Sequence, residues 1–261
     1  MRLESPRGPV TVRTGPPGQV TVRAWVEAGS AGSDPLDLRR GEEGLEITVS
    51  SPGPEGPGPR PRVRFELLLP PASDLVLRVG EGDLSVEGVG GRVRMETDSG
   101  DLTARSCGDV AAGSVNGDIA LDSCRSAEAN TVSGTIRIRG VEGPVTATCV
   151  SGSIYMEEMV SPSVRASTTG GDIRFMGSVL EGGTYRLSSH SGDIAFTARG
   201  GRGFVLNLST FSGSIAIPLD VTLTSSPISR RSLRGRWGDA AASVELDAFS
   251  GNIRLEASAR R

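Results

Sequence analysis

The chain has 261 residues, a formal net charge of −3 and 4% aromatic residues, and all 28 of its basic residues are arginine. Without lysine, Schiff-base chemistry and the lysine-dependent phosphate-binding loop are excluded. Scattered single arginines and so few aromatic side chains argue against a nucleic-acid-binding surface. Val, Ile, Leu and Ala must therefore fill the core in thin layers.

The N-terminal part of the chain, residues 1–73, contains four short segments with the period-2 alternation of β-strands, at residues 10–12, 20–26, 45–49 and 63–69. Residues 51–61 are too rich in proline and glycine for a strand interior, so they predict a long flexible loop. We expect residues 1–73 to form a small N-terminal β-strand region that caps the domain following it.

From residue 74 to residue 261 the sequence follows a repeat. A small residue, a glycine, a polar residue and an aliphatic residue recur together, with glycines at Gly82, Gly100, Gly117, Gly134, Gly152, Gly171, Gly192, Gly213 and Gly251. The steps between successive glycines are similar, except for the last, from Gly213 to Gly251, which is about twice as long. We interpret that long step as two coils, one of which has lost its signature. Periodicity of this kind is typical of a repeat architecture.

Each repeat contains two pairs of apolar residues at positions i and i+2. Ile136 and Ile138 flank Arg137 after one turn, and Val145 and Ala147 precede the next signature. Alternation places the apolar pairs inside and Arg137 in water. The sequence therefore predicts an all-β, single-stranded β-solenoid, or β-helix, of about ten coils, in which each strand pairs with its equivalent about 4.8 Å away in the next coil.

The C-terminal part interrupts this pattern. Residues 218–237 lack the repeat, and we expect them to contain the degenerate coil and a surface loop. The charged tail at residues 256–261 is suited to blunting one end of the solenoid, where unpaired strand edges would otherwise be exposed.

The serial Ser-Gly-Asp-Ile/Leu signatures from Gly82 to Ile253, preceded by the lead-in at residues 67–75, resemble a known family. It is a bacterial β-strand-repeat domain of unknown function, often labelled a putative adhesin. The resemblance covers nearly the whole chain and implies the solenoid fold, with no catalytic or cofactor residues. Many members carry a membrane segment or leader. This sequence shows neither, so the expected location is cytoplasmic, with the cell envelope as the alternative that the family implies.

Glycine–aspartate turns raise the question of calcium, because calcium-binding β-roll repeats present an aspartate at every turn. The Gly-Gly-x-Gly-x-Asp spacing is missing, and other coils carry Thr135, Ser153, Ser214 or Asn252 in place of the aspartate. A calcium ladder cannot lose its carboxylates so freely. We therefore interpret these residues as turn formers and predict no metal site.

His190 is the only histidine, and it precedes Ser191 and Asp193. Adjacent residues on one turn cannot form the converging geometry of a catalytic triad. Apolar residues hold the same position in other coils: Val115, Val132, Val150, Phe211 and Phe249. We therefore predict that His190 is a corner packing residue.

Cys107 and Cys124 are separated by one full coil and precede the second turn of their coils. Stacking places their α-carbons about 5 Å apart, within the range of a disulfide. Free thiols are the expected state in a chain without an export signal, and a disulfide is the alternative. Cys149 falls in another column and is expected to be small and partly buried. The pair Glu157 and Glu158 is expected to lie in a solvated turn.

These features predict a non-enzymatic structural or interaction protein that presents a long polar face to a protein or glycan partner, with no catalytic, cofactor-binding or metal residues. One alternative is a carbohydrate-binding or carbohydrate-active β-helix. Another is a self-assembling filament or scaffold that associates through the solenoid ends. No nucleic-acid partner and no direct membrane insertion are expected.

Overall fold

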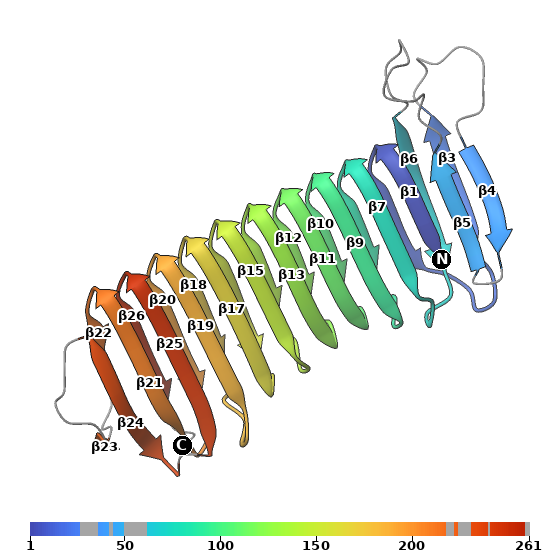
Figure 1. Ribbon diagram of the computed structural model, residues 1–261. Coiled ribbons are helices and arrows are strands. Elements are labelled where there is room, and N and C mark those ends of the chain that lie inside the picture. Colours follow the sequence, from blue (N-terminus) through green and yellow to red (C-terminus); the bar gives the residue numbers. More distant parts are fainter. Residues whose placement is uncertain are drawn as a thin grey trace.

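The protein is a straight two-sheet rod (Figure 1), seen in a computed structural model that describes residues 1–26, 36–41, 44–49, 62–217, 222–223, 231–239 and 241–258. Within these residues the chain forms 26 strands and no helix. The predicted all-β solenoid is confirmed. The predicted loop at residues 51–61 lies outside the described residues.

The first sheet has 14 strands and the second has 12. The first contains, in spatial order, β23 (Thr222–Leu223), β24 (Ser232–Gly238), β21 (Gly203–Ser212), β25 (Ala242–Ser250), β19 (Thr184–Ser191), β17 (Ser163–Gly170), β15 (Val145–Ser151), β13 (Ser126–Ser133), β11 (Asp109–Asn116), β9 (Arg92–Ser99), β7 (Leu75–Glu81), β1 (Arg2–Arg7), β5 (Gly44–Val49) and β4 (Leu36–Gly41). The second contains β22 (Ile215–Ala216), β26 (Ile253–Ser258), β20 (Ile194–Arg199), β18 (Ile173–Gly177), β16 (Ile154–Met159), β14 (Ile136–Arg139), β12 (Ile119–Asp122), β10 (Leu102–Arg105), β8 (Leu84–Glu87), β2 (Val10–Thr14), β6 (Val63–Leu69) and β3 (Thr21–Val26).

One coil consists of a strand in the first sheet, a signature turn and a strand in the second sheet. From β7 to β20 each strand pairs in parallel with its equivalent in the next coil. The register places Ile136 between Ile119 and Ile154, and Ile154 beside Ile173. All four side chains are fully buried. The predicted column of stacked aliphatic residues is therefore confirmed.

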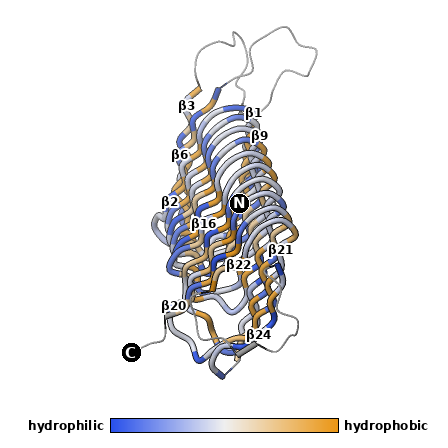
Figure 2. Tube along the Cα trace, turned by 90° about the vertical axis from the view of Figure 1, so that its left-hand side faces the viewer, coloured by the Kyte–Doolittle hydropathy of each residue, from blue (hydrophilic) through white to orange (hydrophobic). Residues whose placement is uncertain are grey.

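A single apolar core runs between the two sheets for the length of the rod. Figure 2 shows the coils that enclose it, coloured by the hydropathy of each residue. Alanines such as Ala112, Ala129 and Ala147 are buried in this core together with larger aliphatic residues. Aromatic side chains fill the core near Phe175, where the buried rings of Phe175 and Phe196 stack with centroids 4.6 Å apart and Tyr185 meets both edge-on.

At the N-terminal end the order of the coils differs from the order of the chain. The first two strands, β1 and β2, lie between β5–β6 and β7–β8 rather than at the edge. Strands β1 and β4 had no sequence prediction. In β1 the side chains on the buried face are Leu3 and Ser5. With only one apolar residue on that face, the strand lacks the alternating pattern that would predict it from the sequence. Strands β3 and β4 complete this end in antiparallel pairing.

The C-terminal end shows the same inversion. The last coil, β25–β26, inserts between β19–β20 and β21–β22. The interpretation of the long step from Gly213 to Gly251 as two stacked coils is therefore wrong. Strand β24, which lies within that step, runs antiparallel between β21 and the edge strand β23. The predicted end-blunting role of the tail is also wrong for its described part, because Glu256 belongs to β26 in the interior of the stack.

Candidate binding surfaces

The signature turns are joined by hydrogen bonds that run from one coil to the next. The Asp83 carboxylate accepts the backbone N–H of Asp101, and Asp101 accepts that of Asp118, each at 2.9 Å. Side chains of Ser153 and Asn252 accept the same bond in other coils. A carboxylate charge is therefore not required, which supports the interpretation of these residues as turn formers. Among the described residues, no group of three or more His, Cys, Asp or Glu side chains is placed to hold a metal ion.

A column of buried hydroxyl side chains lies beside these turns in the first sheet. Thr131 donates to the carbonyl oxygen of Gly117 at 3.3 Å, and Thr168 donates to that of Gly152 at 3.0 Å. Ser189 repeats the bond one coil further on. We did not predict this column, although a Thr, Ser or Cys two residues before the signature serine recurs in several coils of the sequence. These bonds fix how each first-sheet strand enters its turn.

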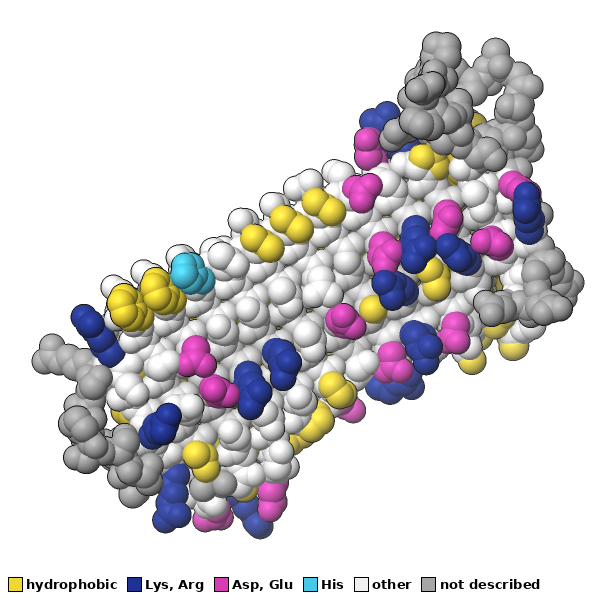
Figure 3. Space-filling view, in the orientation of Figure 1, with side chains coloured by type: hydrophobic (Ala, Val, Ile, Leu, Met, Phe, Trp, Pro, Cys, Tyr) yellow, Lys and Arg dark blue, Asp and Glu magenta, His cyan; other side chains and the backbone are white. Residues whose placement is uncertain are grey.

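From β11 to the C-terminal end of the stack, the residue after each position of this column points outward, because side chains alternate along a strand. Cys149 and Ala248 take the place of the hydroxyl residue before Val150 and Phe249. The outward row, which we call the ridge, comprises Val115, Val132, Val150, Thr169, His190, Phe249 and Phe211. Its three valines are 43–46% exposed, and Phe249 and Phe211 are 49% and 66% exposed. Figure 3 shows the ridge as a line of apolar side chains with the histidine along one edge of the rod. Two shallow grooves lie beside it.

His190 lies at the predicted corner position, where it is exposed on the ridge and packs against a neighbouring ring rather than in the core. Its ring stacks on that of Phe249 with centroids 4.6 Å apart, and Phe249 stacks on Phe211 at 4.9 Å. The ladder follows the spatial order of the coils, because β25 lies between β19 and β21. The sequence alignment placed His190 correctly in one column with the valines and phenylalanines. The side chain that points into the core at this corner is the preceding residue, Ser189.

Comparison with known proteins identifies the family. The model of the Toastrack DUF4097 family, a domain of unknown function, matches residues 1–256. The chain belongs to this family. The resemblance inferred from the repeated signatures is therefore confirmed. No curated protein matches the Toastrack chain.

A solved structure of a putative cell adhesion protein from Clostridium sporogenes ATCC 15579 is 11% identical to this Toastrack chain. The alignment covers 98% of this chain and 91% of the other, with a TM-score of 0.28. A likeness of this size carries no argument about function. Within the described part of the Toastrack chain, no helix is long and apolar enough to cross a membrane.

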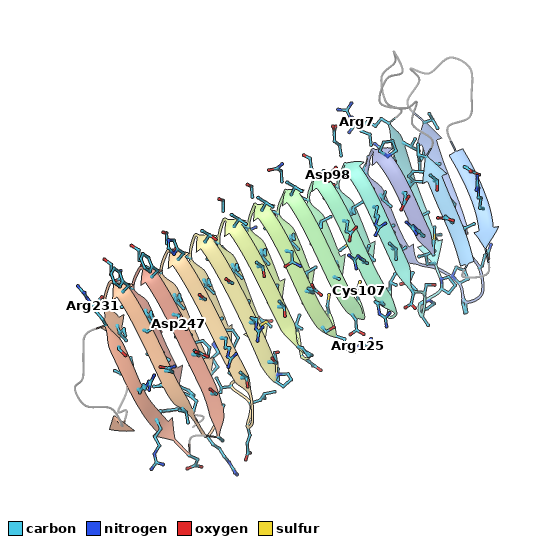
Figure 4. The ribbon with its side chains drawn as sticks, viewed as in Figure 1. Arg7, Asp98, Cys107, Arg125, Arg231 and Asp247 are labelled. Atoms are coloured by element: carbon cyan, nitrogen blue, oxygen red, sulfur yellow. The ribbon has the colours of Figure 1, made fainter. Side chains whose placement is uncertain are left out.

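Cys107 and Cys124 are both buried free cysteines in this Toastrack structure, as is Cys149 (Cys107 is labelled in Figure 4). Cys107 and Cys124 lie two residues beyond the paired positions Arg105 and Asp122, so consecutive coils bring them together. A hydrogen bond from the Cys124 thiol lowers the pKa of Cys107, and the same bond together with burial raises the pKa of Cys124. Burial raises the pKa of Cys149.

We expect iodoacetamide to alkylate Cys107 faster than Cys124 or Cys149 in the native protein at neutral pH. Only the thiolate is nucleophilic, and Cys107 is the thiol with the lowered pKa. Peptide mass spectrometry over a time course measures the three rates. In denaturant the rates should converge, since the thiols then have ordinary pKa values. Equal native rates at Cys107 and Cys124 would contradict the assignment.

The carboxylates Glu157 and Glu158 are both exposed, at an irregularity in β16. Glu158 forms an ion pair with Arg139 at 2.7 Å, and the hydrogen bonds from Arg139 lower the pKa of Glu158. A carboxylate held ionised in this way is poorly suited to act as a general acid. Both side chains are solvated as predicted, but they lie within β16 rather than in a turn.

Proposed function

We propose that this Toastrack chain is a non-enzymatic interaction protein that binds another protein along the ridge. The single observation that carries the proposal is the exposure of Val115, Val132, Val150, Phe249 and Phe211, which is 43–66%. Exposed apolar side chains scattered singly are ordinary on protein surfaces, whereas contiguous ones mark interaction sites. Stacking of successive coils makes the three valines adjacent to one another and the two phenylalanines adjacent to one another, with Thr169 and His190 between the two groups.

The shape beside the valines supports a protein partner. A groove of about 880 Å³ runs along this part of the ridge and is lined by outward residues such as Gly113, Asn130 and Thr148 as well as by Val132. These side chains are small or uncharged. The charged lining residues Glu4, Arg78, Glu96 and Asp98 lie at the end of the groove next to β1, where Arg78 forms ion pairs with Glu4 and Glu96. A partner that covers the valines beyond Asp98 can therefore place its own side chains in the groove without burying an unpaired charge.

The geometry of the aromatic ladder makes a glycan a poorer occupant of this surface. The rings of His190, Phe249 and Phe211 are within 8° of parallel and cover each other's faces. Phe249 is therefore covered on both faces, and the ladder leaves open ring faces only at its two ends. A sugar ring packs best on an open aromatic face, whereas apolar side chains of a protein can pack against edges.

The strands at the two ends of the rod make end-to-end assembly into a filament less favourable. The larger sheet ends in antiparallel strands on both sides, β4 at one end and β23–β24 at the other. A second copy would have to continue the parallel coil pairing through these strands. Lateral contact along the ridge needs no such rearrangement.

Photo-cross-linking from the ridge tests the proposal. With a benzoylphenylalanine at position 132, we expect a discrete adduct with a second protein from the source cells. The adduct should be lost in a Val115→Ser/Val150→Ser background, because the flanking apolar contacts are then removed. The same probe at position 160 is the matched control, since Val160 is equally exposed but lies off the ridge.

The results separate the alternatives. Equal cross-linking from positions 132 and 160 would refute the ridge as the binding surface. An adduct consisting only of a second copy of this chain would replace a protein partner with self-association. Hydrolysis of any member of a polysaccharide panel by the purified protein would overturn the non-enzymatic assignment.

A further inference from the structure

The outer face of the second sheet carries a groove of about 600 Å³ that is separate from the ridge. Its lining comes from six consecutive strands, β10 to β20, so the groove crosses the strands and follows the rod axis. Small side chains form its floor on either side of the centre, including Thr103, Ala120 and Ala195. This lining fits an elongated ligand that lies across several coils.

An arginine–tyrosine–arginine row occupies the centre of the groove. Arg137, Tyr155 and Arg174 are paired in register on β14, β16 and β18. The guanidinium of Arg137 lies 5.9 Å from the centroid of the Tyr155 ring, and that of Arg174 lies 5.6 Å from it. Because the two arginines come from opposite neighbours of β16, they hold the ring between them.

The row leaves positive charge available to a ligand. Arg137 also donates to Asp118 at 3.1 Å, whereas within the described chain no carboxylate lies within 4.0 Å of the Arg174 guanidinium. The groove lining contains four arginines and two carboxylates. Contact with the tyrosine ring orients the guanidinium groups before a ligand arrives, which reduces the entropy lost on binding.

The distance between the two guanidinium groups indicates how the charges of a ligand should be spaced. The two guanidinium groups are separated by two inter-strand steps, or about 10 Å. A linear chain with carboxylates repeating on that scale can engage both arginines at once through paired N–H donors. The groove therefore favours a polymer of regularly spaced carboxylates over a single small anion.

The sheet face distinguishes a glycan from a peptide. The backbone N–H and C=O groups of β14, β16 and β18 are used in pairing between coils. An extended peptide on this face would find no partners for its own backbone groups, since strand addition requires a free sheet edge. A sugar chain needs only side-chain contacts, and its hydroxyl groups can remain in water. We propose that this groove binds an acidic polysaccharide through its uronate carboxylates.

Calorimetric titration with de-esterified oligogalacturonate tests the proposal, with the methyl-esterified oligosaccharide as the charge-free counterpart. We expect the acidic form to bind, the ester not to bind, and binding to weaken as salt is raised. Arg174→Gln should weaken binding about tenfold or more, as expected for losing a hydrogen bond between charged groups. Arg137→Gln should act in the same direction.

Arg165→Gln is the matched control, because it removes the same charge from an exposed position on the first sheet. It should leave binding unchanged, and thermal unfolding of all three variants should match the parent. Three results would overturn the proposal: no binding of the acidic oligosaccharide to the parent protein, full binding by the Arg137→Gln/Arg174→Gln variant, or tighter binding of poly-glutamate than of the oligosaccharide. None of these bears on the ridge.

Discussion

Gly134→Ala should lower the free energy of unfolding by about 3 kcal/mol or more. Gly134 has a φ of 146°, which side-chain-bearing residues rarely adopt. A Cβ atom placed on it would overlap the carbonyl oxygen of Gly117 in the adjacent coil. Backbone strain and steric overlap therefore act together at this position.

The surrounding ladder prevents relief of that overlap. The N–H of Gly134 donates to Ser151 at 3.2 Å, and the N–H of Gly117 donates to Ser133 at 3.0 Å. Moving Gly134 away from Gly117 would lengthen the bond from Gly117 to Ser133 and would displace the donor of the bond to Ser151. The cost therefore falls on two inter-coil contacts rather than on one turn.

Gly113→Ala is the matched control. A Cβ atom on Gly113 would have no heavy atom within 4 Å, so we expect a change of at most about 1 kcal/mol, in the stabilising direction. Urea denaturation followed by circular dichroism compares the two variants with the parent. Similar stabilities for Gly134→Ala and Gly113→Ala would contradict the close approach of the turns.

Ile253→Ala should cost about 2–5 kcal/mol, and Ile215→Ala much less. Both isoleucines follow the signature glycine of their coils at the same position. Sequential stacking would make Ile253 the terminal residue and Ile215 the interior one. The structure reverses them, because Ile253 pairs with Ile194 on one side and Ile215 on the other. Ile253 is fully buried, whereas Ile215 is only partly buried.

Amide hydrogen exchange in the Ile253→Ala and Ile215→Ala variants tests the order of the coils directly. Ile253→Ala should reduce amide protection in β21 as well as in β25, since β25 holds β21 on the rod. Ile215→Ala should affect amides near β22 alone. A larger loss of stability from Ile215→Ala than from Ile253→Ala would show that the coils stack in chain order.

Only part of the groove on the second sheet could be predicted from the sequence. Alternation alone predicts that Arg137 and Arg174 face water. Their convergence on Tyr155 depends on the register of strands from three consecutive coils, which the coil lengths imply but which chemistry at any one position does not reveal. For His190 the opposite holds: the sequence predicted which residues align with it, but not that its side chain is exposed.

The sequence by itself determined the repeat, the inward aliphatic columns and the glycine turns, since these follow from the conformational preferences and alternation of neighbouring residues. Tertiary structure alone decided that β1–β2 and β25–β26 lie inside the stack, which residues of the ridge stay exposed, and which arginines share Tyr155. The physical reason is that every coil offers nearly the same edge and the same apolar pairs to its neighbours. Local patterning therefore fixes which way each side chain points, while the choice among equivalent neighbours depends on the packing of the whole rod.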